Sequence, residues 1–147
     1  GVRLHEVSPK NKMVDLKLVI GTKEGKTVQK EIKSPEADAL HNKIIGDTVK
    51  GDEMGMPGYE FLVTGGSDKC GFPMRKGIQA PRKRVFIGKS VGFSGKDRNK
   101  KKRGGVHVRK TVCGERITKI IRQVNLKVTK AGSAPLDAPA AAEETPK

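Results

Sequence analysis

Positive charge is concentrated in the middle of this chain. Of the formal net charge of +15, residues 69–110 supply +14, from 15 Lys and Arg against one acidic residue, Asp97. Residues 1–68 carry a net charge of −1, and residues 111–147 carry +2. So many cations repel one another unless a polyanion neutralises them, and counterion release makes nucleic acid the usual polyanion. This distribution predicts a binding protein with a neutral folded body and one cationic face.

Length and composition narrow the class of protein further. The 147 residues suit one domain with tails, and the 18 glycines bring a hydrophobic content of 34% near the usual apolar share. No apolar run approaches the ~20 residues that a membrane-spanning helix needs. The two cysteines form no CxxC pair; one disulfide is possible, but free thiols in a reducing cytosol are the better interpretation. We therefore expect a cytoplasmic, soluble protein that contacts no membrane.

Alternation of apolar and polar residues predicts a fold made mainly of β-strands. The first strand is predicted around residues 14–20, and the glycine turn at 21–25 joins it to a second strand that ends near Ile32. Further strands are predicted at residues 59–64, 85–87 and 117–128, of which the last is the longest. This pattern, with many glycines, favours a small, barrel-like antiparallel sheet with basic loops.

One short helix is predicted to follow the first hairpin. Ser34 can cap a free backbone N–H group, and Pro35 suits the first helical position. An apolar stripe continues to Ile44, and Gly46 ends the predicted helix. We expect this helix to cover the open end of the sheet.

The chain divides into three parts by composition. Residues 1–12 show weak patterning and are expected to form an N-terminal extension. Residues 13–130 are expected to form the folded domain, including the basic segment 69–110. Residues 131–147 are rich in Ala and Pro, a composition that predicts a tail without fixed structure in isolation.

The most distinctive segment is VTGGSDKCGFPM, at residues 63–74. Its glycines permit positive φ and close backbone approach, and its aspartate can accept hydrogen bonds from the N–H groups of the loop. Physical reasoning alone leaves two interpretations open: a well-made turn after a strand, or an ordered loop that carries cations toward phosphates. The residues assigned to the loop scaffold are Gly65, Gly66, Asp68, Gly71 and Pro73.

This segment resembles the signature of small-subunit ribosomal protein six of the eukaryotic and archaeal type. The resemblance continues through Arg75-Lys76-Gly77, the run Arg82–Val85 and the basic stretch to Arg109, and it spans roughly residues 14–130. It implies a β-rich structural protein of the small ribosomal subunit, with rRNA and neighbouring ribosomal proteins as partners. Eukaryotic members carry a long basic C-terminal helix with phosphorylated serines. This chain stops at Lys147 without one, so we expect a short, archaeal-type form.

The densest basic run, KDRNKKKRGGVHVRK at residues 96–110, could be a plain solvated surface, but Gly95, Gly104 and Gly105 bracket its most basic part and let it bend along RNA. We expect it to be mobile in the free protein and ordered on RNA. Arg can clamp phosphates through two hydrogen bonds, and A-form RNA offers mainly phosphates and 2′-hydroxyls. The residues predicted to contact RNA are Lys69, Arg75, Lys76, Arg82, Lys83, Arg84, Lys96, Arg98, Lys100, Lys101, Lys102, Arg103, Arg109 and Lys110. A second group, in which strand alternation aims only some members at RNA, comprises Arg116, Lys119 and Arg122.

Catalytic and metal-binding motifs are incomplete in this sequence. Residues 20–27 end like a Walker A loop, but Ile20 replaces the first glycine and a charged alternating strand follows. The histidines and cysteines lack ligand-like spacing. We therefore expect no catalytic residue, metal, cofactor or small-molecule substrate. Two alternatives stay open: a transient RNA-binding translation or assembly factor, and an RNA-modifying enzyme built on a barrel.

Overall fold

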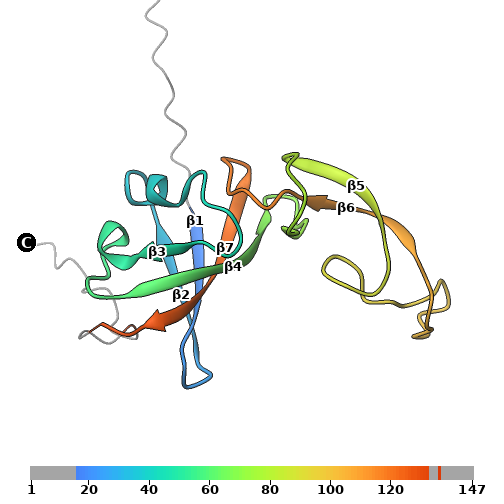
Figure 1. Cartoon of the computed structure of the whole chain (residues 1–147), viewed down its shortest axis with the longest axis horizontal. Coiled ribbons are helices and arrows are strands. Elements are labelled where there is room, and N and C mark those ends of the chain that lie inside the picture. The colour runs from blue at the N-terminus through green and yellow to red at the C-terminus, as the bar shows by residue number, and fades with distance from the viewer. Residues whose placement is uncertain (1–15, 133–135, 137–147) are drawn as a thin grey trace, which may run out of the picture.

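The computed structural model of this chain describes residues 16–132 and residue 136 (Figure 1). The predicted N-terminal extension and nearly all of the Ala/Pro-rich tail lie outside the described residues, as does the start of the predicted first strand. The described part contains one five-stranded sheet and one two-stranded sheet. The expectation of a mainly β protein is confirmed.

The five-stranded sheet forms the body of the molecule. Its strands are β1 (Leu16–Gly21), β2 (Thr27–Ile32), β3 (Thr48–Lys50), β4 (Glu60–Asp68) and β7 (Ile121–Lys130). They lie in the order β2-β1-β7-β4-β3. The sheet is open, with β2 and β3 at its edges, so the barrel comparison is a loose one. It is also not wholly antiparallel, because β1 pairs with β7 in parallel.

Local alternation explains the two strands that the sequence predicted best. In β1, Leu16, Leu18 and Ile20 are fully buried, whereas Lys17 points outward. The hairpin β1–β2 is confirmed, with residues 22–26 as its loop. Each buried Leu or Ile side chain contributes roughly 1.5–3 kcal/mol through the hydrophobic effect. The longest strand is β7, as predicted, although it begins four residues later than the sequence indicated.

The short helix is present, but it is of the 3-10 type and covers only Glu36–Leu40 (η1). Beyond it, Asn42 adopts a left-handed conformation with φ of 67°. The Asn42 N–H group donates to the carbonyl of Ile117 at 3.0 Å, and not to a carbonyl of the preceding turn. A tertiary hydrogen bond thus replaces the helical one and ends the helix before Gly46. A second 3-10 helix, η2 (Gly51–Met54), was not predicted from the sequence.

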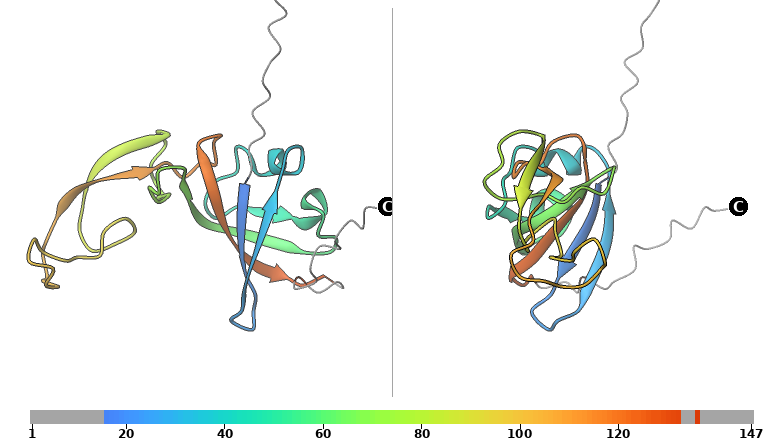
Figure 2. Two further views of the ribbon diagram at one scale, coloured as in Figure 1. Left: turned by 180° about the vertical axis from the view of Figure 1, so that it is seen from behind. Right: turned by 90° about the vertical axis from the view of Figure 1, so that its right-hand side faces the viewer.

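A two-stranded arm projects from one end of the body (Figure 1 and the left view of Figure 2). It consists of β5 (Arg82–Ile87), β6 (Val108–Cys113) and the connecting residues 88–107. The two strands pair antiparallel along their whole length. The sequence predicted part of β5 but treated residues 96–110 as one mobile run. The last three of those residues belong to β6. This strand was missed because its charged residues interrupt the alternation of apolar and polar residues that predicts a strand.

Candidate nucleic-acid interface

The arm gathers most of the residues predicted to contact RNA. Some lie on its two strands, a larger group lies in residues 96–103, and the rest lie between β4 and the arm. Every predicted residue is exposed except Arg75, which is half-buried. The fold therefore places most of the cations of the middle segment on one projecting element, away from the buried core.

The turn at residues 96–103 carries the densest charge. The backbones of Lys96 and Lys102 pair in an isolated antiparallel β-bridge. Within it, the Asp97 N–H group donates to the Lys101 carbonyl at 2.8 Å. The carboxylate of Asp97 lies 3.9 Å from the guanidinium of Arg103. One carboxylate cannot neutralise the surrounding cations, so the turn keeps a strong positive field for an anionic partner.

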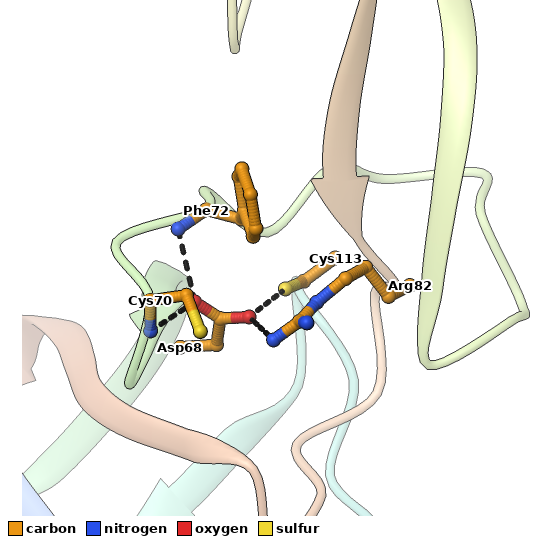
Figure 3. A network of polar contacts seen from close by, with 5 residues as sticks. All are labelled: Asp68, Cys70, Phe72, Arg82 and Cys113. Atoms are coloured by element: carbon orange, nitrogen blue, oxygen red, sulfur yellow. Dashed lines mark hydrogen bonds and ion pairs between the residues drawn. The ribbon is translucent and has the colours of Figure 1, made fainter.

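Asp68 joins the body to the base of the arm (Figure 3). Its carboxylate is buried at the end of β4. One oxygen, Oδ1, accepts hydrogen bonds from the N–H groups of Cys70 at 2.8 Å and Phe72 at 3.0 Å. The other, Oδ2, accepts from the Arg82 guanidinium and from the Cys113 thiol, the latter at 3.3 Å. We call these five residues the Asp68 cluster.

The Asp68 cluster holds its charges in defined states. Burial pushes the pKa of Asp68 upward, but the hydrogen bonds from Phe72, Arg82, Cys113 and Cys70 outweigh it and keep that pKa below its ordinary value. Burial, reinforced by the Asp68 carboxylate, raises the pKa of the Cys113 thiol to about 11. At neutral pH the cluster therefore contains an ionised Asp68 and a protonated Cys113.

Arg82 differs from the other predicted RNA contacts because it has a structural partner. Its guanidinium pairs with Asp68 and lies 5.0 Å from the centroid of the Phe72 ring. The hydrogen bond to Asp68 raises the pKa of Arg82 above its ordinary value. We therefore assign Arg82 to joining the arm to the body, and its contact with RNA stays a prediction.

Arg75 also has internal partners. Its Nη1 donates to the Ser90 hydroxyl at 2.9 Å and to the Val91 carbonyl at 2.8 Å. These bonds fasten the start of the arm's connecting segment to the stretch between β4 and β5, in which Arg75 lies. Most of the donor capacity of Nη1 is thereby used inside the protein.

The scaffold residues play unequal roles. Gly66 allows close backbone approach, because a Cβ there would lie 2.3 Å from the Gln123 carbonyl oxygen, and Gly71 has a positive φ of 84°. Gly65 shows neither constraint, since a Cβ there would meet no atom within 4 Å. The backbone of Pro73 pairs with that of Ser67 in an isolated β-bridge, which closes the loop.

Cys113 was missed by sequence reasoning, because nothing near it in the chain indicates a partner 45 residues away.

The second group of cations is divided between surface and pocket. Arg116 and Lys119 are exposed, whereas Arg122 is half-buried. Arg122 and Lys69 both line a pocket of about 450 Å³ at the edge of the sheet where β4 ends and β7 begins, which residues of β1 and β2 also line. Lys17 lines the same pocket, but Glu31 offsets part of its charge at 3.5 Å.

No group of three or more His, Cys, Asp or Glu side chains in residues 16–132 could hold a metal ion. No helix among the described residues is both long and apolar enough to cross a membrane.

Comparison with known proteins agrees with the resemblance seen in the loop signature. The family model described as ribosomal protein S6e matches residues 16–141. The chain is 36% identical to the small ribosomal subunit protein eS6 of Methanocella arvoryzae, over 85% of each chain. It is 40% identical to eS6 of Methanococcus maripaludis over 81% of this chain and 90% of the relative, and 39% identical to eS6 of Nanoarchaeum equitans over 88% and 90%. With the family model covering most of its length and archaeal relatives of this similarity, the chain belongs to the ribosomal protein S6e family, whose members are ribosomal proteins and not enzymes.

Proposed function

We propose that this chain is a structural constituent of the small ribosomal subunit that binds and stabilises folded rRNA during translation. In this role it is ribosome-bound in the cytoplasm, with rRNA and neighbouring ribosomal proteins as partners. Family membership supports the ribosomal role. The observation that carries the RNA contact is the projecting arm, on which exposed Lys and Arg side chains outnumber a single carboxylate.

Shape and charge act together in this proposal. A two-stranded arm can reach between RNA helices while the body stays on the outside, and its cations then meet phosphates from several sides. Each phosphate contact releases condensed counterions, which makes binding favourable and sensitive to salt. Lys side chains adapt their positions, whereas Arg side chains fix the orientation of a phosphate through paired hydrogen bonds.

Sedimentation tests residence on the particle. We expect the protein to track the small subunit through sucrose gradients after a high-salt wash, because an arm held within folded rRNA must release many phosphates together. A transient translation or assembly factor would instead wash into the supernatant. Loss of the protein from washed subunits would therefore contradict the proposal.

Salt dependence tests the type of contact. With roughly 6–10 phosphates contacted, the affinity for small-subunit rRNA is expected to fall by about 10³–10⁵ between 50 and 200 mM salt. A filter-binding series measures this slope directly. An affinity that hardly changes with salt would show that phosphate contacts are not the main source of binding.

A further inference from the structure

Phe86 is an exposed aromatic residue on β5, the strand that begins with Arg82, Lys83 and Arg84. Its side chain is 65% exposed, the largest exposed fraction among the large hydrophobic residues that the structure describes. In the antiparallel register of the arm, Phe86 lies opposite Arg109, and Arg84 precedes it by two positions on β5. Directly opposite residues share one face of a ribbon, with Cβ atoms about 4.5–5.5 Å apart, and residues two positions apart on one strand point to the same face. One face of the arm therefore presents an aromatic ring between two arginines.

The Phe86 ring already has one stacking partner within the arm. The centroid of the His107 ring lies 5.5 Å from it, with 25° between the ring planes. Nδ1 of His107 donates to the carbonyl of Gly105 at 2.9 Å, which fixes the imidazole in place. Gly88 makes room for it, since a Cβ there would lie 3.0 Å from Nε2 of His107. The two rings thus form a small preformed platform.

The opposite face of the arm shows that apolar residues can be covered there. Ile87 and Val112 are buried beneath the connecting segment, where a Cβ on Gly92 would lie 3.0 Å from Val112 Cγ1. The chain therefore folds over Ile87 and Val112 on one face and leaves the aromatic side chain of the other open. A single exposed apolar residue needs no explanation. An open ring that stacks on imidazole and shares its face of the ribbon with Arg84 and Arg109, however, has the composition of a nucleotide-binding surface.

We propose that Phe86 stacks on an unpaired base of rRNA, while Arg84 and Arg109 bind the phosphates beside that base. This inference rests on the proposed function and names the class of nucleotide that the arm takes. Unpaired bases in RNA are recognised by stacking on aromatic rings and on guanidinium planes, and every base offers the π-face required. The flanking cations match a phosphate backbone. A base within a continuous A-form duplex is already stacked on both sides and cannot stack on the Phe86 ring.

The chain contains no tryptophan, which provides a clean test. In the full-length protein, Phe86→Trp places one fluorescent indole at this position. We expect an oligoadenylate of about 12 nucleotides to quench it strongly and an RNA duplex of the same length to quench it little. Phe86→Ala and Phe86→Leu should each weaken oligoadenylate binding by about 5- to 150-fold and leave duplex binding unchanged. Phe86→Tyr, which keeps a ring, should retain most of the affinity.

Three outcomes would overturn the stacking proposal. The first is an unquenched Phe86→Trp protein whose Phe86→Ala counterpart binds oligoadenylate like the wild type. The second is an equal loss of oligoadenylate and duplex affinity, which would indicate a distorted arm. The third is unchanged RNA affinity with poor incorporation into small subunits reconstituted with their other proteins, which would assign the ring to a protein neighbour. Failure of the proposed function is distinguishable, because the wild type would then bind neither RNA.

Discussion

The body and the arm are two antiparallel-rich β structures made by one chain, but they are stabilised differently. The body buries a continuous core from five strands, with residues such as Leu18, Phe61 and Val124 fully inaccessible. The arm has two strands, a small apolar cluster beneath its connecting segment, and the Asp68 cluster at its base. An isolated two-stranded ribbon is marginally stable in water at best. The comparison teaches that the body supplies stability and the arm supplies charge, so substitutions in each should affect different measurements.

The largest effect is expected from the core of the body. Phe61 is fully buried and stacks on Tyr59 with 5.7 Å between ring centroids. Phe61→Ala should lower the free energy of unfolding by about 3–5 kcal/mol, because it removes a large apolar side chain and leaves a cavity. Urea denaturation measures this change. Phe86→Ala on the arm is the matched control and should change the free energy of unfolding little; equal losses for the two variants would break the comparison.

A somewhat smaller effect is expected where the body meets the arm. Asp68→Ala leaves the N–H groups of Cys70 and Phe72 without their acceptor and removes the partner of Arg82. The free energy of unfolding should fall by about 2–4 kcal/mol. Limited proteolysis should also cleave the arm faster than the body. Unchanged proteolysis and normal incorporation into the small subunit would show that the Asp68 cluster does not hold the arm in place.

Charge removal should separate binding from stability. Replacing Lys100, Lys101 and Lys102 by Gln should weaken RNA binding roughly 100-fold near 0.1 M salt and reduce the salt slope by about 2–3, if each lysine meets one phosphate. The free energy of unfolding should change little, because these side chains are exposed. The matched control replaces three exposed lysines of the body by Gln, namely Lys23, Lys33 and Lys50. If both triple variants lose the same affinity, the arm is not the principal contact.

The smallest effect concerns the two thiols. Cys70 is exposed, whereas Cys113 is buried with its pKa raised to about 11. At pH 8 one thiol in each folded chain should react with a disulfide reagent, because only a thiolate attacks and Cys113 stays protonated. A raised folded-state pKa contributes stability below the ordinary pKa of 9.0, and this contribution is lost as the pH rises toward 11. Cys113→Ala should lack this part of the alkaline decline in unfolding free energy, and rapid reaction of both thiols at pH 8 would contradict the prediction.

The sequence predicted the body better than the arm for a physical reason. In β1 and β7, burial alternates along the strand, so the pattern of Leu, Ile and Val carries the structural signal directly. In β6, the consecutive residues Arg109 and Lys110 are exposed on opposite faces of the ribbon. Because both are charged, no alternation of apolar and polar residues indicates the strand there. The helix was overextended because Asn42 bonds to Ile117, a contact that local propensity cannot reveal.

The candidate interface was predicted in outline, and its internal partners were not. Composition alone located the cations in residues 69–110, because charge needs no folding to be counted. The engagement of Arg82 by Asp68, and of Arg75 by Ser90, depends on how distant segments meet. The same holds for Phe86, whose exposure follows from which face of the arm the connecting segment covers. RNA contact by the individual residues stays a prediction.

The position of β7 sets the order in which this chain can fold during its own synthesis. This strand is placed between β1 and β4, so the early hairpin β1–β2 and the pair β3–β4 have no backbone hydrogen bonds to each other until β7 arrives. Residues 82–113 leave the exit tunnel before residues 121–130 do. The cationic arm therefore emerges while the five-stranded sheet of the body still lacks β7. An anionic partner present at that stage would meet the arm before the finished domain exists.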